Sequence, residues 1–329
     1  MIAVYGASIT QQKNGYARQL SSKLDETVQI FGYGGMHIKD AGISFIDKVL
    51  EVKPSYCFID WFSTGYKDTN KETMEYIDTI IYKFTTNNCK LIFLFFPRTD
   101  DEGREEFYLF CKKYLEKKKI FYIDLNSEIN NNELNIVLRD IVHTTDYGSN
   151  LYSSKIAEIF KTNKNNIIFP SNMEATQYSY IDKISIERVF DKTLVLNGNC
   201  KIIGFYLTVG PHSGIVEIDN GESIQKYNTW DRWCAYPRKH FSLSFFINGV
   251  TQINILKDEF DTSNCKKDHD FTKRKKKLIV HNIYYVGEFL ELTNINSGKK
   301  ISKTQIFFNE NLRRIKYYAD LLKQRLLNL

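Results

Sequence analysis

Three residues of types that can perform nucleophilic catalysis stand at two distant places in the sequence. Ser8 follows the apolar run Ile2–Tyr5 and a glycine, whereas Asp140 and His143 stand three residues apart much further along the chain. A serine hydroxyl becomes a nucleophile when an imidazole accepts its proton, and the imidazole needs a carboxylate to fix its tautomer. Asp140 and His143 could supply both functions to Ser8. Each residue also has a structural interpretation, since Ser8 and Asp140 could cap helices and His143 could be an ordinary loop residue.

The first half of the sequence alternates short apolar runs with amphipathic stretches, which is typical of a parallel sheet covered by helices on both faces. Reactive crevices in such sheets form at the carboxyl ends of the strands, where Ser8 would stand on a tight turn before a helix. We therefore predict a three-layer α/β/α domain over residues 1–162. Its predicted strands are Ile2–Tyr5, Val28–Gly32, Tyr56–Phe62, Leu91–Phe96 and Ile120–Asp124. Its predicted helices lie near Gly15–Lys23, Ala41–Val49, Lys71–Phe84, Arg104–Lys117 and Ser149–Phe160.

The second half contains short β-type runs separated by turn signals, which favours a β-sandwich-like domain over residues 168–308. The Asn-Gly pairs at Asn197-Gly198 and Asn248-Gly249 each predict a tight hairpin. An amphipathic pattern predicts a terminal helix over residues 309–329. The predicted strands are Thr193–Leu196, Lys201–Val209, Gly214–Ile218, Phe241–Ile247, Thr251–Ile255, Lys277–Val286 and Phe289–Leu292.

The chain is long for one globular domain and fits two comfortably. The chain has 329 residues, 43% of them hydrophobic and 26% charged, with a net charge of +6. Much of the positive charge lies between Lys266 and Lys277, which favours a solvated loop over a nucleic-acid surface. The six cysteines show no metal-ligand spacing, so we expect reduced thiols and no metal. The strand-like beginning and the absence of a long apolar run predict a cytoplasmic protein without a membrane span.

The segments that carry these residues resemble sequence blocks of the SGNH (GDSL-like) hydrolase family. Gly6-Ala7-Ser8 is similar to the first block, Phe31-Gly32-Tyr33-Gly34-Gly35 to the second, and Asp140-Ile141-Val142-His143 to the last block, D-x-x-H. The resemblance covers roughly residues 1–160. It implies that Ser8 is the nucleophile of a triad with Asp140 and His143. It also implies that the N–H groups of Ser8 and Gly35 form an oxyanion hole.

Two positions depart from the family pattern. Ala7 replaces the usual aspartate of the first block, and Gly65 stands where the third block normally has an asparagine that donates to the oxyanion. Loss of one oxyanion donor typically costs about 3 kcal/mol of transition-state stabilisation. Ser63, Thr64 or the Gly65 N–H could substitute for it, or the enzyme could be slow. A third possibility is that the fold is retained for binding alone.

Further residues could contact a substrate. His37, Asp60 and Arg98 follow or end predicted strands at the reactive edge of the sheet, although Asp60 and Arg98 could simply form an ion pair. Trp230 and Trp233, beside charged residues, could stack on sugar rings or belong to a core.

Together, these features predict serine-dependent acyl transfer on a carbohydrate ester. The enzyme would be an O-acetyl esterase without a cofactor, or a sugar O-acetyltransferase that uses an acyl donor such as acetyl-CoA. A non-catalytic carbohydrate-binding protein on the same scaffold is the alternative.

Overall fold

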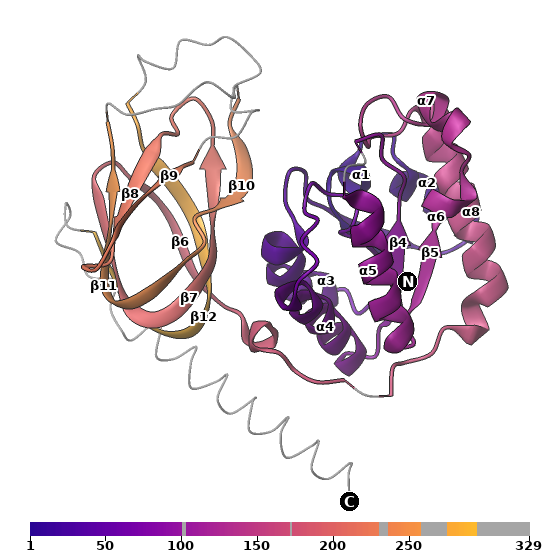
Figure 1. The fold of residues 1–329 in the computed structure, drawn as a ribbon, viewed down its shortest axis with the longest axis horizontal. Coiled ribbons are helices and arrows are strands. Elements are labelled where there is room, and N and C mark those ends of the chain that lie inside the picture. The colour runs from indigo at the N-terminus through magenta and orange to yellow at the C-terminus, as the bar shows by residue number, and fades with distance from the viewer. Residues whose placement is uncertain (101–102, 172, 230–235, 258–274, 295–329) are drawn as a thin grey trace, which may run out of the picture. The chain divides into compact units, whose positions relative to one another are not determined.

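The computed structural model describes residues 1–100, 103–171, 173–229, 236–257 and 275–294, and Figure 1 shows its ribbon. The chain forms two compact units that divide between Ile181 and Asp182. No helix within the described residues is long and apolar enough to cross a membrane. The predicted terminal helix over residues 309–329 lies outside the described residues, as do Trp230 and Trp233.

The first unit is built on a five-stranded parallel sheet with the strand order β2-β1-β3-β4-β5. Its strands are β1 (Ile2–Gly6), β2 (Val28–Gly32), β3 (Tyr56–Asp60), β4 (Lys90–Phe95) and β5 (Phe121–Asp124). Its helices are α1 (Ser8–Gln11), α2 (Tyr16–Leu24), α3 (Ile46–Leu50), α4 (Lys71–Thr86), α5 (Arg104–Lys117), α6 (Leu125–Glu128), α7 (Leu134–Val137) and α8 (Asp146–Asn163). A π-helix, η1, spans Ile38–Gly42, and 3₁₀ turns cover Asn131–Glu133 (η2), Lys164–Asn166 (η3) and Gln177–Tyr180 (η4).

Alternate side chains of β1 pack on opposite faces of this sheet, because a strand has a period of two residues. Ile2 and Val4 belong to an apolar cluster with residues of α2 and α8. Tyr5 instead packs near Phe84 of α4, with 6.2 Å between the ring centroids. Helices therefore cover both faces, and the predicted three-layer α/β/α fold is confirmed.

The segment before Asp182 packs on the first unit. The hydroxyls of Thr176 and Thr79 lie 2.6 Å apart, and Tyr178 donates a hydrogen bond to Glu72. This segment therefore belongs to the first unit, which ends at Ile181.

The described residues of the second unit form an antiparallel sheet of seven strands that share one apolar core. The order is β6-β12-β7-β11-β8-β9, with β10 also paired to β7. This arrangement confirms the predicted β-rich, sandwich-like domain. The strands are β6 (Asp182–Phe190), β7 (Thr193–Val209), β8 (Ile215–Asp219), β9 (Ile224–Asn228), β10 (Arg238–Ser242), β11 (Phe245–Ile255) and β12 (Leu278–Asn294).

The two predicted Asn-Gly hairpins are wrong. Both pairs lie inside long strands, with Gly198 of β7 opposite Gly249 of β11. A side chain on Gly198 would meet the carbonyl oxygen of Glu288 at 2.6 Å, so the close approach of β12 demands glycine there. Gly249 has a φ of +84°, a conformation that glycine adopts without strain. These glycines therefore serve strand packing and local backbone geometry instead of chain reversal.

Candidate active site

Ser8 stands directly beyond the C-terminal end of β1, as predicted. Gly6 is paired with Asp60 of the parallel neighbour β3, and a Cβ on Gly6 would meet the Asp60 carbonyl oxygen at 2.4 Å. Only glycine allows the two strands to approach so closely. Ser8 follows as the first residue of α1, so its N–H has no helical carbonyl to bond. The side chain of Ser8 is partly exposed.

Asp60 lies beneath this turn and is completely buried. Its carboxylate accepts hydrogen bonds from the hydroxyls of Thr10 (2.8 Å) and Ser63. Burial raises the pKa of Asp60 to about 7, although both hydroxyls and the nearby Arg98 lower it. The Asp60 carbonyl oxygen also accepts the N–H of Ala7 at 3.0 Å. Asp60 therefore supports the Ser8 turn from below.

These contacts change the interpretation of three predicted residues. Because Asp60 has no exposed surface, it does not reach a substrate in this structure. The Ser63 hydroxyl donates to Asp60, so it is not available as an oxyanion donor. Arg98 is nearly buried and pairs with Asp100 through Nε (2.7 Å) and Nη2 (2.6 Å). Arg98 also donates to the Ser63 carbonyl, and no ion pair with Asp60 is found among the described residues.

Asp140 and His143 form the predicted pair. His143 Nδ1 lies 3.0 Å from both carboxylate oxygens of Asp140. Asp140 Oδ1 also accepts the backbone N–H groups of Val142 (3.0 Å) and His143 (2.8 Å). Partial burial would raise the pKa of Asp140, but these N–H donors and the His143 ring outweigh it, and the pKa lies below its ordinary value. Asp140 is therefore a carboxylate at neutral pH, suited to hold the proton on Nδ1.

Gln12, which directly follows α1, connects this helix to the histidine loop. Its Nε2 donates to the Thr144 carbonyl at 2.8 Å. Its Oε1 accepts from both the N–H and the hydroxyl of Thr144, each at 3.2 Å. Since Thr144 is adjacent to His143, these three bonds fix the histidine loop relative to the Ser8 helix. This role could not be predicted from a pattern, because glutamine has no characteristic motif and its partner lies 132 residues away.

The neighbouring Gln11 holds the glycine loop after β2. Its Oε1 accepts the N–H of Gly34 at 2.8 Å. An ideal Cβ on Gly34 would lie 3.8 Å from the Cβ of Ser8, so this loop stands beside the serine. Gly35 follows with a φ of +73°, which favours glycine. The loop therefore places Gly34, the neighbour of the predicted oxyanion donor Gly35, beside Ser8.

His37 and Gly65 lie close together near these loops. A Cβ on the exposed Gly65 would lie 3.9 Å from His37 Nε2, and His37 Nδ1 lies 3.5 Å from Asp40 Oδ2. His37 is partly exposed and remains a predicted substrate contact. Within the described residues, no three His, Cys, Asp or Glu side chains group in a way that could hold a metal ion.

Ser8 and His143 line the same open pocket of about 480 Å³. Among the described residues, no hydrogen bond joins the Ser8 hydroxyl to His143. Such bonds are often long in ligand-free sites and tighten when substrate binds. The pocket therefore offers the Ser8 hydroxyl and the imidazole of His143, which is bonded to the Asp140 carboxylate. The other lining residues are Gln11, Gln12, Lys13, Asn14, Arg139 and Asp146.

No protein-family model and no curated protein matches the sequence. Among solved structures, a two-domain esterase active on acetylated mannans, co-crystallised with mannopentaose, matches with a TM-score of 0.64 and 13% identity, covering 88% of this chain and 90% of that chain. The acetyl xylan esterase AlAXEase matches with a TM-score of 0.42 and 19% identity, over 48% of this chain and 98% of its own. A member of the lipolytic protein G-D-S-L family from Veillonella parvula DSM 2008 matches with a TM-score of 0.42 and 18% identity, over 49% of this chain and 97% of its own. The first match extends over both units and shows the same fold.

Proposed function

We propose that this protein is a serine esterase that removes acetyl groups from a polysaccharide, with Ser8, His143 and Asp140 as its catalytic triad. One observation carries the proposal: His143, bonded to Asp140 through Nδ1, lines the same open pocket as Ser8. The order of the three residues along the chain and the fold of the first unit agree with this assignment.

In the acylation step, His143 Nε2 accepts the Ser8 proton while Oγ attacks the acetyl carbonyl carbon. Asp140 keeps the other ring proton on Nδ1 and stabilises the imidazolium that forms. The imidazolium then donates its proton to the departing sugar oxygen. The free sugar hydroxyl leaves, and the acetyl group remains on Ser8.

The negative charge that develops on the carbonyl oxygen needs hydrogen-bond donors. The N–H groups of Ser8 and Gly35 are the candidates, with the N–H of the exposed Gly65 as a third. Because Gly65 has no side-chain amide and Ser63 is bonded to Asp60, the hole consists of backbone donors. We expect a lower kcat than in a site with a further side-chain donor.

In the deacylation step, His143 removes a proton from water while the water oxygen attacks the acetyl-enzyme carbonyl. The imidazolium returns this proton to Ser8 Oγ as the ester bond breaks, and acetate is released. The Ser8 pocket is open, and its residues Gln11, Lys13 and Asn14 are exposed, so water can reach the ester. This access favours hydrolysis over transfer to a sugar. No cofactor is needed for hydrolysis, whereas transfer would require an acetyl donor such as acetyl-CoA.

The proposed substrate class follows from the two-unit match. The solved esterase that shares the fold over both units acts on acetylated mannans, so acetylated mannan is the first substrate to test. Acetylated xylan provides a second polysaccharide with a different backbone.

The experiment measures acetate release from acetylated mannan, acetylated xylan and p-nitrophenyl acetate by the parent protein and Ser8→Ala. Ser22→Ala, at an exposed serine of α2, is the matched control. A fluorophosphonate adduct mapped by mass spectrometry identifies the nucleophile. We expect activity and labelling in the parent and Ser22→Ala, and neither in Ser8→Ala.

Three outcomes would contradict the proposal. Labelling of another serine would overturn the nucleophile assignment, and a parent protein inactive on all three esters would favour the non-catalytic alternative. A gain of polysaccharide acetyl groups in the presence of acetyl-CoA would identify a transferase.

A further inference from the structure

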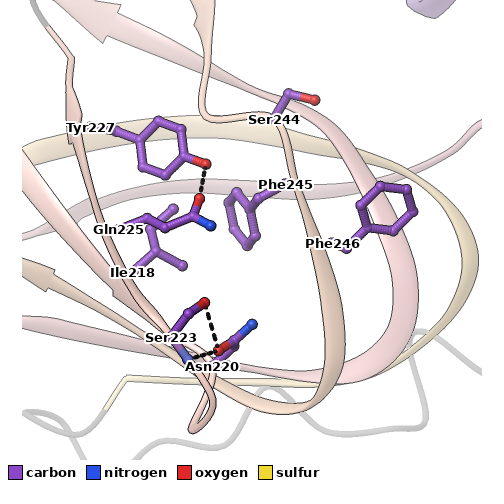
Figure 2. A pocket seen from close by; sticks show the side chains of 8 residues that line it. All are labelled: Ile218, Asn220, Ser223, Gln225, Tyr227, Ser244, Phe245 and Phe246. Atoms are coloured by element: carbon purple, nitrogen blue, oxygen red, sulfur yellow. Dashed lines mark hydrogen bonds between the residues drawn. The ribbon is translucent and has the colours of Figure 1, made fainter.

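A second pocket, of about 310 Å³, lies in the second unit beside β8, β9 and the beginning of β11 (Figure 2). Its volume is at the lower end of the range of small-ligand sites, about 300–1,000 Å³, and suits one monosaccharide unit. Among the described residues, none of the side chains that line it is charged. They are Ile218, Asn220, Ser223, Gln225, Tyr227, Ser244, Phe245 and Phe246.

The pocket exists because the core of this unit is open at β9. Gln225 of β9 is the strand partner of Ile218, and Tyr227 is the partner of Val216. Partners in register project to the same face of a sheet, and Ile218 and Val216 are buried core residues. Gln225 is nevertheless exposed, so within the described part of the unit no opposing layer covers the core-facing side of β9 there. The apolar floor consists of Ile218, Phe245 and the half-buried ring of Tyr227.

Two side-chain amides are fixed so that their nitrogen atoms can donate to a ligand. Gln225 Oε1 accepts the Tyr227 hydroxyl at 2.6 Å. Asn220 Oδ1 accepts the N–H groups of Ser223 (2.8 Å) and Glu222 (3.1 Å). Neither amide nitrogen has an acceptor among the described residues. Figure 2 shows both amide nitrogens on the side of their side chains that faces Phe245.

We propose that this pocket binds one unit of a neutral sugar chain. The aromatic and aliphatic floor would contact the apolar face of a sugar ring, and the two amides would donate to its hydroxyl oxygens. The uncharged lining that the described residues provide favours a neutral sugar over a phosphate or a uronic acid. This assignment rests on the proposed function for its ligand class. It implies that the second unit keeps the polysaccharide tethered to the chain that carries Ser8, which raises the local concentration of ester.

The test is calorimetric titration of full-length Ser8→Ala with mannopentaose and xylopentaose. Asn220→Asp and Gln225→Glu, each added to Ser8→Ala, retain the acceptor oxygens that Ser223 and Tyr227 need but remove the amide donors. Each should weaken binding about tenfold, as expected for one lost hydrogen bond, and the double variant should abolish it. Gln252→Glu, at an exposed position of β11 outside the pocket, is the isosteric control and should bind as the Ser8→Ala parent does. Near-ultraviolet circular dichroism confirms that each variant is folded.

Two results would overturn the assignment: no saturable binding of either pentaose, or equal binding by the parent and both pocket variants. Equal binding would place the sugar elsewhere, for example in the Ser8 pocket. Because Ser8→Ala lacks the proposed nucleophile, this titration measures binding independently of hydrolysis. The two proposals can therefore fail separately. If the parent protein releases no acetate but binding still depends on both amides, the proposed function is refuted and the sugar pocket is supported.

Discussion

Asp60→Asn offers a quantitative test of the buried network beneath Ser8. Asp60 has no exposed surface, and burial raises its pKa from 3.8 to about 7. In the unfolded chain the same carboxyl group ionises near its ordinary value of about 4. Between these two values the folded protein retains a proton that the unfolded chain releases. The free energy of unfolding therefore falls as the pH rises from about 4 to about 7, and levels off above that.

The size of this effect follows from the two pKa values. A difference of about 3 units corresponds to about 4 kcal/mol in total. About 2–3 kcal/mol of this change falls between about pH 5 and about pH 8. Asparagine cannot ionise, and its amide can still accept one hydroxyl and donate to the other. From about pH 5 to about pH 8, the free energy of unfolding should therefore fall by about 2–3 kcal/mol more in the parent protein than in Asp60→Asn.

Urea unfolding at the two pH values measures the effect, with hydrogen exchange of peptides from β1 and β3 as the probe of the first unit. The change in unfolding free energy between the two pH values is subtracted, variant from parent, and this difference removes the contribution of every other titrating group. Asp68→Asn, at an exposed aspartate, is the matched control and should behave as the parent does. If Asp60→Asn and the parent show the same pH dependence, Asp60 is ionised in the folded protein and the network is better solvated than its burial implies.

Three further predictions concern the loop that carries His143 and the elements beside it. Asp140→Asn should lower kcat on p-nitrophenyl acetate by about 10²-fold or more with little change in KM, since the imidazole loses the carboxylate that fixes its tautomer. Gln12→Ala should lower kcat about tenfold with a smaller effect on KM, because three hydrogen bonds to Thr144 disappear. The control Gln29→Ala, at an exposed position of β2, should change neither constant. Gly148→Ala should destabilise the protein by about 1–3 kcal/mol in thermal unfolding, since the new Cβ would lie 2.1 Å from the Val137 carbonyl oxygen. An unchanged kcat in the first two variants, or an unchanged Tm in the third, would contradict the respective argument.

Patterns within one segment were sufficient to predict much of the first unit. The alternation of apolar runs and helical stretches predicted the parallel sheet, because each element is encoded by its own periodicity. The Asp140–His143 pair could also be predicted, since a spacing of three residues lets one loop form the contact. The Asn-Gly signals failed because a short motif carries no information about a third strand, here β12 behind Gly198.

Interactions between distant segments could not be predicted in this way. Ser63 could serve an oxyanion hole or a buried carboxylate, and only the fold shows that its hydroxyl donates to Asp60. The same limit applies to Gln225 in the second unit. Its sequence neighbours do not reveal that it faces an open part of the core opposite Ile218.

The position of Ser8 depends on contacts outside its own helix. α1 has only four residues, too few for a helix to be stable by itself in water. It is held from below by the close approach of Gly6 to Asp60, and on its flanks by Gln11 and Gln12. The D-x-x-H spacing therefore determines the geometry of the imidazole–carboxylate pair, whereas the Gln12 bonds determine where that pair lies relative to the serine. It follows that a change at Gln12 should alter the transfer of the Ser8 proton while the His143–Asp140 contact remains intact.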